Sequence, residues 1–213
     1  MNNNNNGTRP TRRQFLCQSA IMVGSVFAAP AFVQSADNVP APTPQPIIKP
    51  PLSSDFLTSQ ELNLPQRNLH MYNIHTGESV FQTYWAEGEY VQKGVLQISH
   101  HMRDHRENET LLMDEHLLDV LWGVQQRLGN DFQYNIVSGY RSPKTNEMLR
   151  RRSKNVARNS LHMRGMACDF NTGQHTLESL RDAAVDLGAG GVGYYPGTGF
   201  VHVDTGPVRL WKV

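Results

Sequence analysis

The sequence predicts an α+β fold, a single compact domain in which flanking helices pack on a small antiparallel sheet. Three observations support this prediction. Segments with strand and helix patterns are interleaved along residues 67–213, tight turns join two pairs of neighbouring strands, and no internal repeat is evident. The 213 residues are 38% hydrophobic and 18% charged, which gives one medium-sized domain enough apolar side chains for a core.

Charge and composition exclude several classes of protein. The formal net charge is +1, so no overall charge would attract nucleic acid or an anionic membrane surface. The composition also differs from that of collagen-like, coiled-coil and fully disordered chains. We therefore expect a folded domain with no nucleic-acid partner, and the sequence leaves its oligomeric state open.

The first 31 residues have the pattern of a twin-arginine export signal. Arg12 and Arg13 precede an apolar run over residues 15–29, and the small residues "APA" then fit a cleavage site. The alternative is a membrane anchor, but a run of about 15 residues is shorter than the roughly 20 that a spanning helix needs. We expect cleavage after Ala31, or else after Ala36, and a periplasmic mature protein without a stable membrane span.

Residues 32–66 are predicted to form a proline-rich spacer. Six of the twelve prolines lie within residues 35–51, where they favour extended backbone and exclude helix. The folded domain is therefore expected to span residues 67–213.

The two cysteines give no disulfide. Cys17 lies in the predicted signal, so Cys168 would be alone in the mature chain and cannot form an internal bridge. In the predicted strand "ACDF", Cys168 shares one face with Phe170, while Asp169 lies on the other. This alternation predicts a small core residue rather than a catalytic thiol.

The first half of the domain is predicted to hold a hairpin and two helices. Residues 67–85 form two strands around a turn at 75–78, and residues 94–106 suit a helix. The clearest helix spans 114–128 and is stopped by Gly129. Its apolar residues recur at helical spacing: Leu117, Leu121, Val124 and Leu128.

The second half interleaves strands and helices. A strand over 132–138 is followed by a short helix with Pro143 near its start. A further helix spans 177–187 and ends at the glycine that follows it. Residues 190–206 are then predicted to form two strands around a Pro-Gly-Thr-Gly turn.

Three residues of this second half are candidates for a metal site. His162 and Asp169 flank Gly165, which lets the backbone turn so that side chains on its two sides meet. His202 lies in another predicted strand and shares an outward face with Asp204. Such an arrangement brings His162, Asp169 and His202 together, and two imidazoles with one carboxylate suit a catalytic zinc. Nine histidines also produce chance pairs, so spacing alone leaves the metal site open.

The same residues carry a resemblance to the M15-type zinc peptidases. Every fixed place of the family's S-x-H-x-x-G-x-A-x-D motif is matched, by Ser160, His162, Gly165, Ala167 and Asp169. The stretch "FVHVDTG" around His202 resembles the second half of that signature. "HTGE", "SGYRS" and "GGVGYYP" are similar to a branch once called a domain of unknown function, and the resemblance covers about residues 67–213.

This resemblance implies an M15/hedgehog-like fold with one zinc ion per chain on His162, Asp169 and His202. It also implies hydrolysis of peptide cross-links in peptidoglycan by metal-activated water, so the partners would be stem peptides and their cross-links. Two alternatives remain open. One is a D,D-carboxypeptidase that trims stem peptides, and the other is a metal-holding module that binds the cell wall without turnover.

Two further residues are candidates for the chemistry. The wider family often has a glutamate base three residues before the second histidine, where this chain has Gly199. We take Asp204 as the substitute for that base, and its alternative role is to orient the imidazole of His202. The family uses an arginine at the place of Arg141 to hold a substrate carboxylate or polarise its carbonyl. The alternative for Arg141 is an arginine in a surface turn.

Overall fold

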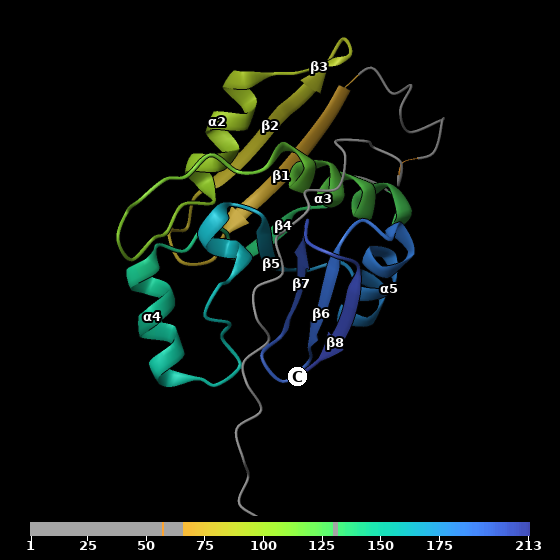
Figure 1. Ribbon diagram of the computed structural model, residues 1–213. Coiled ribbons are helices and arrows are strands. Elements are labelled where there is room, and N and C mark those ends of the chain that lie inside the picture. Colours follow the sequence, from red (N-terminus) through yellow and green to blue (C-terminus); the bar gives the residue numbers. More distant parts are fainter. Residues whose placement is uncertain (1–56, 58–65, 130–131) are drawn as a thin grey trace, which may run out of the picture. The chain divides into compact units, whose positions relative to one another are not determined.

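Figure 1 shows the computed structural model of the chain, which describes residue 57 and residues 66–129 and 132–213. The predicted signal and cleavage site lie outside the described residues, as does the spacer apart from Leu57 and Gln66. Leu57 is 6% exposed and belongs to the apolar core. Within the described part, no helix is both long enough and apolar enough to cross a membrane. The domain boundaries stay predictions.

The described residues form strands and helices in an interleaved order. Along the chain they are β1 (Gln66–Asn73), β2 (Ser79–Ala86), β3 (Glu89–Tyr90), α2 (Gln92–His101), α3 (Glu115–Arg127), β4 (Tyr134–Ser138), α4 (Pro143–Arg152), the 3-10 helix η1 (Leu161–Arg164), β5 (Ala167–Thr172), α5 (Leu177–Leu187), β6 (Gly191–Tyr195), β7 (Phe200–Asp204) and β8 (Arg209–Lys212).

All the described strands belong to one sheet, in the order β3-β2-β1-β4-β5-β7-β6-β8. The predicted α+β class is confirmed, but the sheet is larger than expected and mixed. β1 pairs with β4 in parallel, and β6 pairs with β8 in parallel, while the remaining neighbours are antiparallel. Both parallel pairs join strands that are distant in sequence, so local alternation gave no signal for them.

The two faces of the sheet have different roles. Side chains of one face pack with α2, α3 and α5 in the apolar core, among them Met71, Phe170 and Val201. Cys168 is fully buried on this face, as predicted. Because side chains alternate along a strand, Asp169 and His202 lie on the opposite face. In Figure 1, η1 and the β4–α4 connection lie near the strands that carry these two residues.

The predicted helices agree with the structure except at one end. α3 is capped by the Asp114 side chain, which accepts a hydrogen bond from the His116 amide at 3.1 Å. The helix expected over 94–106 instead spans α2 and ends at His101. Beyond it, the Asp104 amide donates to the Glu109 carbonyl at 2.9 Å, so the chain turns back where the helix was expected to continue.

Candidate metal centre

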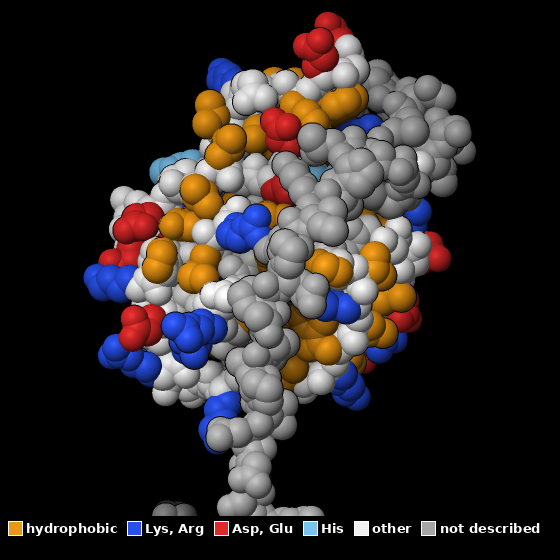
Figure 2. All heavy atoms as spheres, in the orientation of Figure 1, with side chains coloured by type: hydrophobic (Ala, Val, Ile, Leu, Met, Phe, Trp, Pro, Cys, Tyr) orange, Lys and Arg blue, Asp and Glu red, His pale blue; other side chains and the backbone are white. Residues whose placement is uncertain are grey.

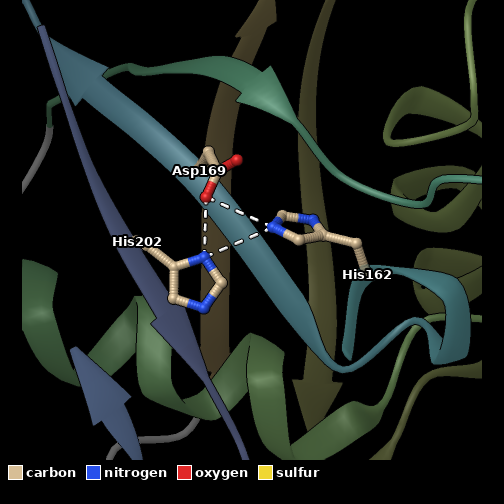
Figure 3. Close-up of side chains that lie close together, drawn as sticks. All are labelled: His162, Asp169 and His202. Carbon is tan, nitrogen blue, oxygen red and sulfur yellow. Dashed lines mark hydrogen bonds and ion pairs between the residues drawn. The ribbon is translucent and has the colours of Figure 1, made fainter. Parts of the chain in front are cut away.

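Three side chains from three elements converge on one face of the sheet. His162 lies on η1, Asp169 on β5 and His202 on β7, and Figure 3 shows them pointing toward one another. Gly165 ends η1 in the left-handed region with φ of 68°, which supplies the predicted turn. Asp169 and His202 are direct partners in the antiparallel β5–β7 pair, so their side chains leave the sheet side by side.

The distances among the three candidate ligand atoms suit a metal ion. His162 Nε2 lies 3.3 Å from His202 Nδ1 and 3.2 Å from Asp169 Oδ1, and His202 Nδ1 lies 2.7 Å from Asp169 Oδ1. Zinc–ligand distances of about 2.0–2.1 Å place neighbouring ligands about 3.3 Å apart in a tetrahedron. Two of the three edges already have that length. Among the described residues, these three form the group of histidine, cysteine and acidic side chains close enough to hold a metal.

Hydrogen bonds on the far side of each imidazole fix which nitrogen faces the centre. His162 Nδ1 donates to the Gly139 carbonyl at 2.7 Å, so Nε2 keeps its lone pair for the centre. His202 Nε2 donates to Asp204 Oδ2 at 2.9 Å, so Nδ1 is the nitrogen that faces Asp169. Such outer partners are the usual companions of metal-binding histidines. The donor set therefore fits a zinc ion in both chemistry and orientation.

The electrostatic environment also suits a metal site. Burial and the charge of Arg141 lower the pKa of His162 to about 4, so this imidazole is neutral at neutral pH. Burial raises the pKa of Asp169, but the two histidines and Arg141 outweigh it and hold that carboxyl well below its usual range. Burial lowers the pKa of His202, yet its hydrogen bonds to Asp169 and Asp204 raise it more. A proton on His202 therefore competes with a metal for this imidazole more than an ordinary histidine's would.

Asp204 is surrounded by donors, and it is also one of the residues that border the cavity over the centre. Its side chain is fully buried, and Oδ2 accepts from His202 Nε2 at 2.9 Å and from Arg209 Nη2 at 2.6 Å. Oδ1 accepts from Arg209 Nη1 at 3.0 Å and from the amides of Gly191 and Gly206 at 3.2 and 2.9 Å. Burial raises the pKa of Asp204, but the hydrogen bonds from His202 and Arg209 lower it by more. The pKa of Asp204 is therefore below its ordinary value. These contacts favour the orienting role over that of a base.

Arg141 contacts the centre directly. Its Nη2 pairs with Asp169 Oδ2, the oxygen that does not face the histidines, and its Nε donates to Ser138 Oγ at 2.7 Å. Its side chain is 14% exposed, so Arg141 is not a free arginine in a surface turn. Arg141 is also one of the residues that border the cavity above the centre.

A cavity of about 600 Å³ opens over the three candidate ligands. It is bordered by residues between 153 and 161, most of them small or polar, and by residues of the β6–β7 hairpin and of β8. Figure 2 shows Lys and Arg side chains gathered over α4, where Arg150, Arg151 and Arg152 are exposed. A volume of this size matches that of sites for small molecules and short peptides.

The structure adds residues to the site that the sequence analysis did not single out. Gly139 orients His162 through its carbonyl, and Arg209 holds Asp204 with both terminal nitrogens. Trp211 borders the cavity beside His202. The available signal was short: Arg209, Trp211 and Val213 alternate in the last five residues, which is a strand pattern with one functional face.

Comparisons with known proteins agree with this geometry. The family model described as "Peptidoglycan L,D-endopeptidase MepK", a model of M15 peptidases, matches residues 62–211. The chain is 43% identical over 145 residues to the MepK protein of Escherichia coli K12, which covers 68% of this chain and 80% of that protein. It is 40% identical over 147 residues to a protein of Haemophilus influenzae named as a probable MepK. That alignment covers 68% of this chain and 79% of that protein.

Proposed function

The chain belongs to the MepK family of M15 peptidases and is a peptidoglycan endopeptidase, and we propose that it works with one zinc ion and cuts L,D-type cross-links. The observation that carries the zinc proposal is the convergence of His162 Nε2, His202 Nδ1 and Asp169 Oδ1, with both imidazoles fixed from behind. The L,D preference is taken from the names of the relatives. Peptidoglycan stem peptides are thus the proposed partner.

Zinc, when bound to His162, Asp169 and His202, supplies a Lewis acid that polarises a peptide carbonyl and lowers the pKa of a water molecule. The chain's own residues prepare the site for it. Gly139 and Asp204 hold the two imidazoles in the orientation that zinc requires, so little reorganisation is needed on binding. We therefore propose that Asp204 orients His202, the alternative to its role as the general base.

For Arg141 we propose a contact with the substrate. Its guanidinium is fixed by Ser138 and by Asp169, and Arg141 borders the cavity. A fixed planar guanidinium holds a carboxylate or a developing negative charge on a carbonyl well. Arg141 would thereby hold the peptide over the zinc ligands while it also holds Asp169 in place.

Digestion of defined muropeptides tests the function. Zinc-loaded protein should convert cross-linked dimers into monomers, and a chelator should stop the reaction until zinc is restored. A carboxypeptidase would instead release free D-alanine from monomers and leave dimers joined, so D-alanine as the main product would overturn the endopeptidase function. Comparing dimers joined by L,D and D,D bonds tests the bond type, since preferential cleavage of the D,D bond would contradict the proposal. If zinc-loaded protein cuts none of these substrates, the wall-binding alternative gains.

We further propose that the protein acts in the periplasm and reaches it by the twin-arginine route. The MepK relatives are named for action on peptidoglycan, which lies outside the cytoplasm, and Arg12 and Arg13 precede an apolar run. Changing both arginines to lysine should leave the precursor in the cytoplasm. Normal export of the double variant would contradict the twin-arginine route but not the peptidase function.

A further inference from the structure

The last strand, β8, borders the metal cleft with every second residue. Arg209, Trp211 and the terminal Val213 border the cavity, whereas Leu210 between them is 59% exposed. β8 is the edge strand of the sheet, and β6 separates it from β7 and His202. Side chains of β8 can therefore reach the metal centre only by crossing over β6.

Two glycines of β6 open that path. A Cβ at Gly191 would lie 2.3 Å from Arg209 Nη1, and a Cβ at Gly193 would lie 2.6 Å from Trp211 Cζ2. In the sheet, Gly193 is the partner of His202 on one side and of Trp211 on the other. The "GGVG" motif thus has a packing reason, because side chains at these positions would occupy the space that Arg209 and Trp211 fill.

Trp211 is held firmly beside the centre. The centroid of its indole lies 5.2 Å from that of the His202 ring, with the two planes at 54°. Its Nε1 donates to Tyr195 Oη at 2.9 Å, and the Arg209 guanidinium lies 4.8 Å over the ring. These contacts fix the indole from several sides, and the half-buried ring still borders the cavity.

Trp211 belongs to an aromatic wall of the cleft, which we define as Tyr195, Phe200 and Trp211. The rings of Tyr195 and Phe200 stack with centroids 4.5 Å apart, and all three residues are half-buried and border the cavity. The lining residues between 153 and 161 are mostly small or polar. An apolar wall on one side of the cleft is complementary to a ligand that presents a surface rich in C–H groups on that side.

We propose that Trp211 is a substrate-contacting residue that determines specificity, because its indole packs on a C–H-rich surface of the substrate beside the scissile bond. Two parts of peptidoglycan offer such a surface: the methylene chain of a stem-peptide side chain and the face of a sugar ring. The inference rests on the peptidase function proposed above. It adds the residue that selects and orients the substrate at that site.

Kinetics of Trp211 variants test the proposal on cross-linked peptide dimers with and without their disaccharides. Trp211→Ala should lower kcat/KM about tenfold or more, mainly through KM, as expected for the loss of ~60 Å² of apolar contact at about 25 cal/mol per Å². Trp211→Phe should lower kcat/KM less than Trp211→Ala does, and the control Leu210→Ala should behave as wild type. A loss on both substrates assigns the contact to the peptide, and a loss confined to the disaccharide substrate assigns it to the sugar. Unchanged kcat/KM on both would overturn the proposal.

A second measurement separates substrate contact from a merely structural role. Protein stripped of metal cannot cut the dimer, so binding can be followed by tryptophan fluorescence, and Trp85 and Trp122 lie outside the cavity. The dimer should change the fluorescence of wild type and of Leu210→Ala, but not that of Trp211→Phe. Binding detected by calorimetry without a change in wild-type fluorescence would contradict contact at Trp211. This titration remains informative even if the wild-type protein cuts nothing, which would instead refute the proposed function.

A substitution at Gly193, over which the Trp211 indole lies, gives an independent check of the proposal. Gly193→Ala should displace the indole and lower kcat/KM as Trp211→Ala does, while zinc content stays at the wild-type level. Once the indole is absent, the added methyl group no longer displaces Trp211, and its close approach to Tyr195 Cε2 at 2.8 Å already contributes to the loss in the single variant. The double variant should therefore lose no more than the worse single variant, and losses that add fully would contradict the path from β8 over Gly193.

Discussion

Replacing Asp204 by asparagine should weaken zinc binding more than it changes turnover at saturating zinc. The carboxylate accepts from His202 Nε2, from both terminal nitrogens of Arg209 and from two backbone amides. An amide of the same size has one oxygen to accept with, so an NH₂ group would face either the His202 donor or the Arg209 donors. Loss of such an outer partner lowers metal affinity about 10- to 100-fold, or about 1.4–2.8 kcal/mol.

Zinc affinity would be measured by competition with a chromogenic chelator, and turnover on muropeptide dimers at saturating zinc. Asp182→Asn is the matched control, because Asp182 is an exposed acid that pairs with Arg181 on α5. The control should match wild type in both assays. If Asp204→Asn keeps full zinc affinity but loses turnover by about a hundredfold, Asp204 is the general base and its orienting role is refuted.

Zinc affinity should fall as pH is lowered, because a proton on His202 Nδ1 competes with the metal and the pKa of His202 is raised above its ordinary value of 6.5. Calorimetric titrations with zinc across pH check this, and an affinity independent of pH would contradict it. Cys168→Ala should keep its turnover, because the thiol is buried and burial raises its pKa; lost turnover with intact folding would make the thiol functional. Arg67→Met should lower the free energy of unfolding in urea by about 3–5 kcal/mol, because the buried Asp119 loses its ion-pair partner. Adding Asp119→Leu should recover part of that loss, and a neutral Arg67→Met would refute the reasoning.

The sequence predicts an element well where the residues within and next to that element determine its structure. The helix predicted over 114–128 matches α3 to within a residue at each end, because an aspartate caps it and Gly129 follows it. The turn at 75–78 matches the β1–β2 hairpin, where Gly77 has a positive φ of 72°. The convergence of His162, Asp169 and His202 was likewise accessible, because strand alternation and one glycine turn made it possible and the family motif singled out these three residues.

The sequence carries no clear indication of features that depend on tertiary packing. β8 is short and at the edge of the sheet, and Leu210 is exposed, so the alternation of Arg209, Trp211 and Val213 was too short to indicate a strand by itself. The place of Asp204 on the same face as His202 was evident from their spacing. Its partners were not, because Arg209 reaches it across the glycines of β6. The role of a carboxylate depends on the donors around it, and tertiary packing supplies those donors.

The proposed function requires zinc held by His162, Asp169 and His202, and metal titration of the stripped enzyme tests this requirement most directly. Zinc would be added stepwise to chelated wild-type protein, with bound metal and cleavage of muropeptide dimers measured at each step. Activity should rise in proportion to bound zinc and stop rising at one ion per chain, while His162→Ala should bind no zinc at that site and cut no substrate. Full activity in protein free of zinc, or a His162→Ala variant that binds one zinc per chain, would contradict the account.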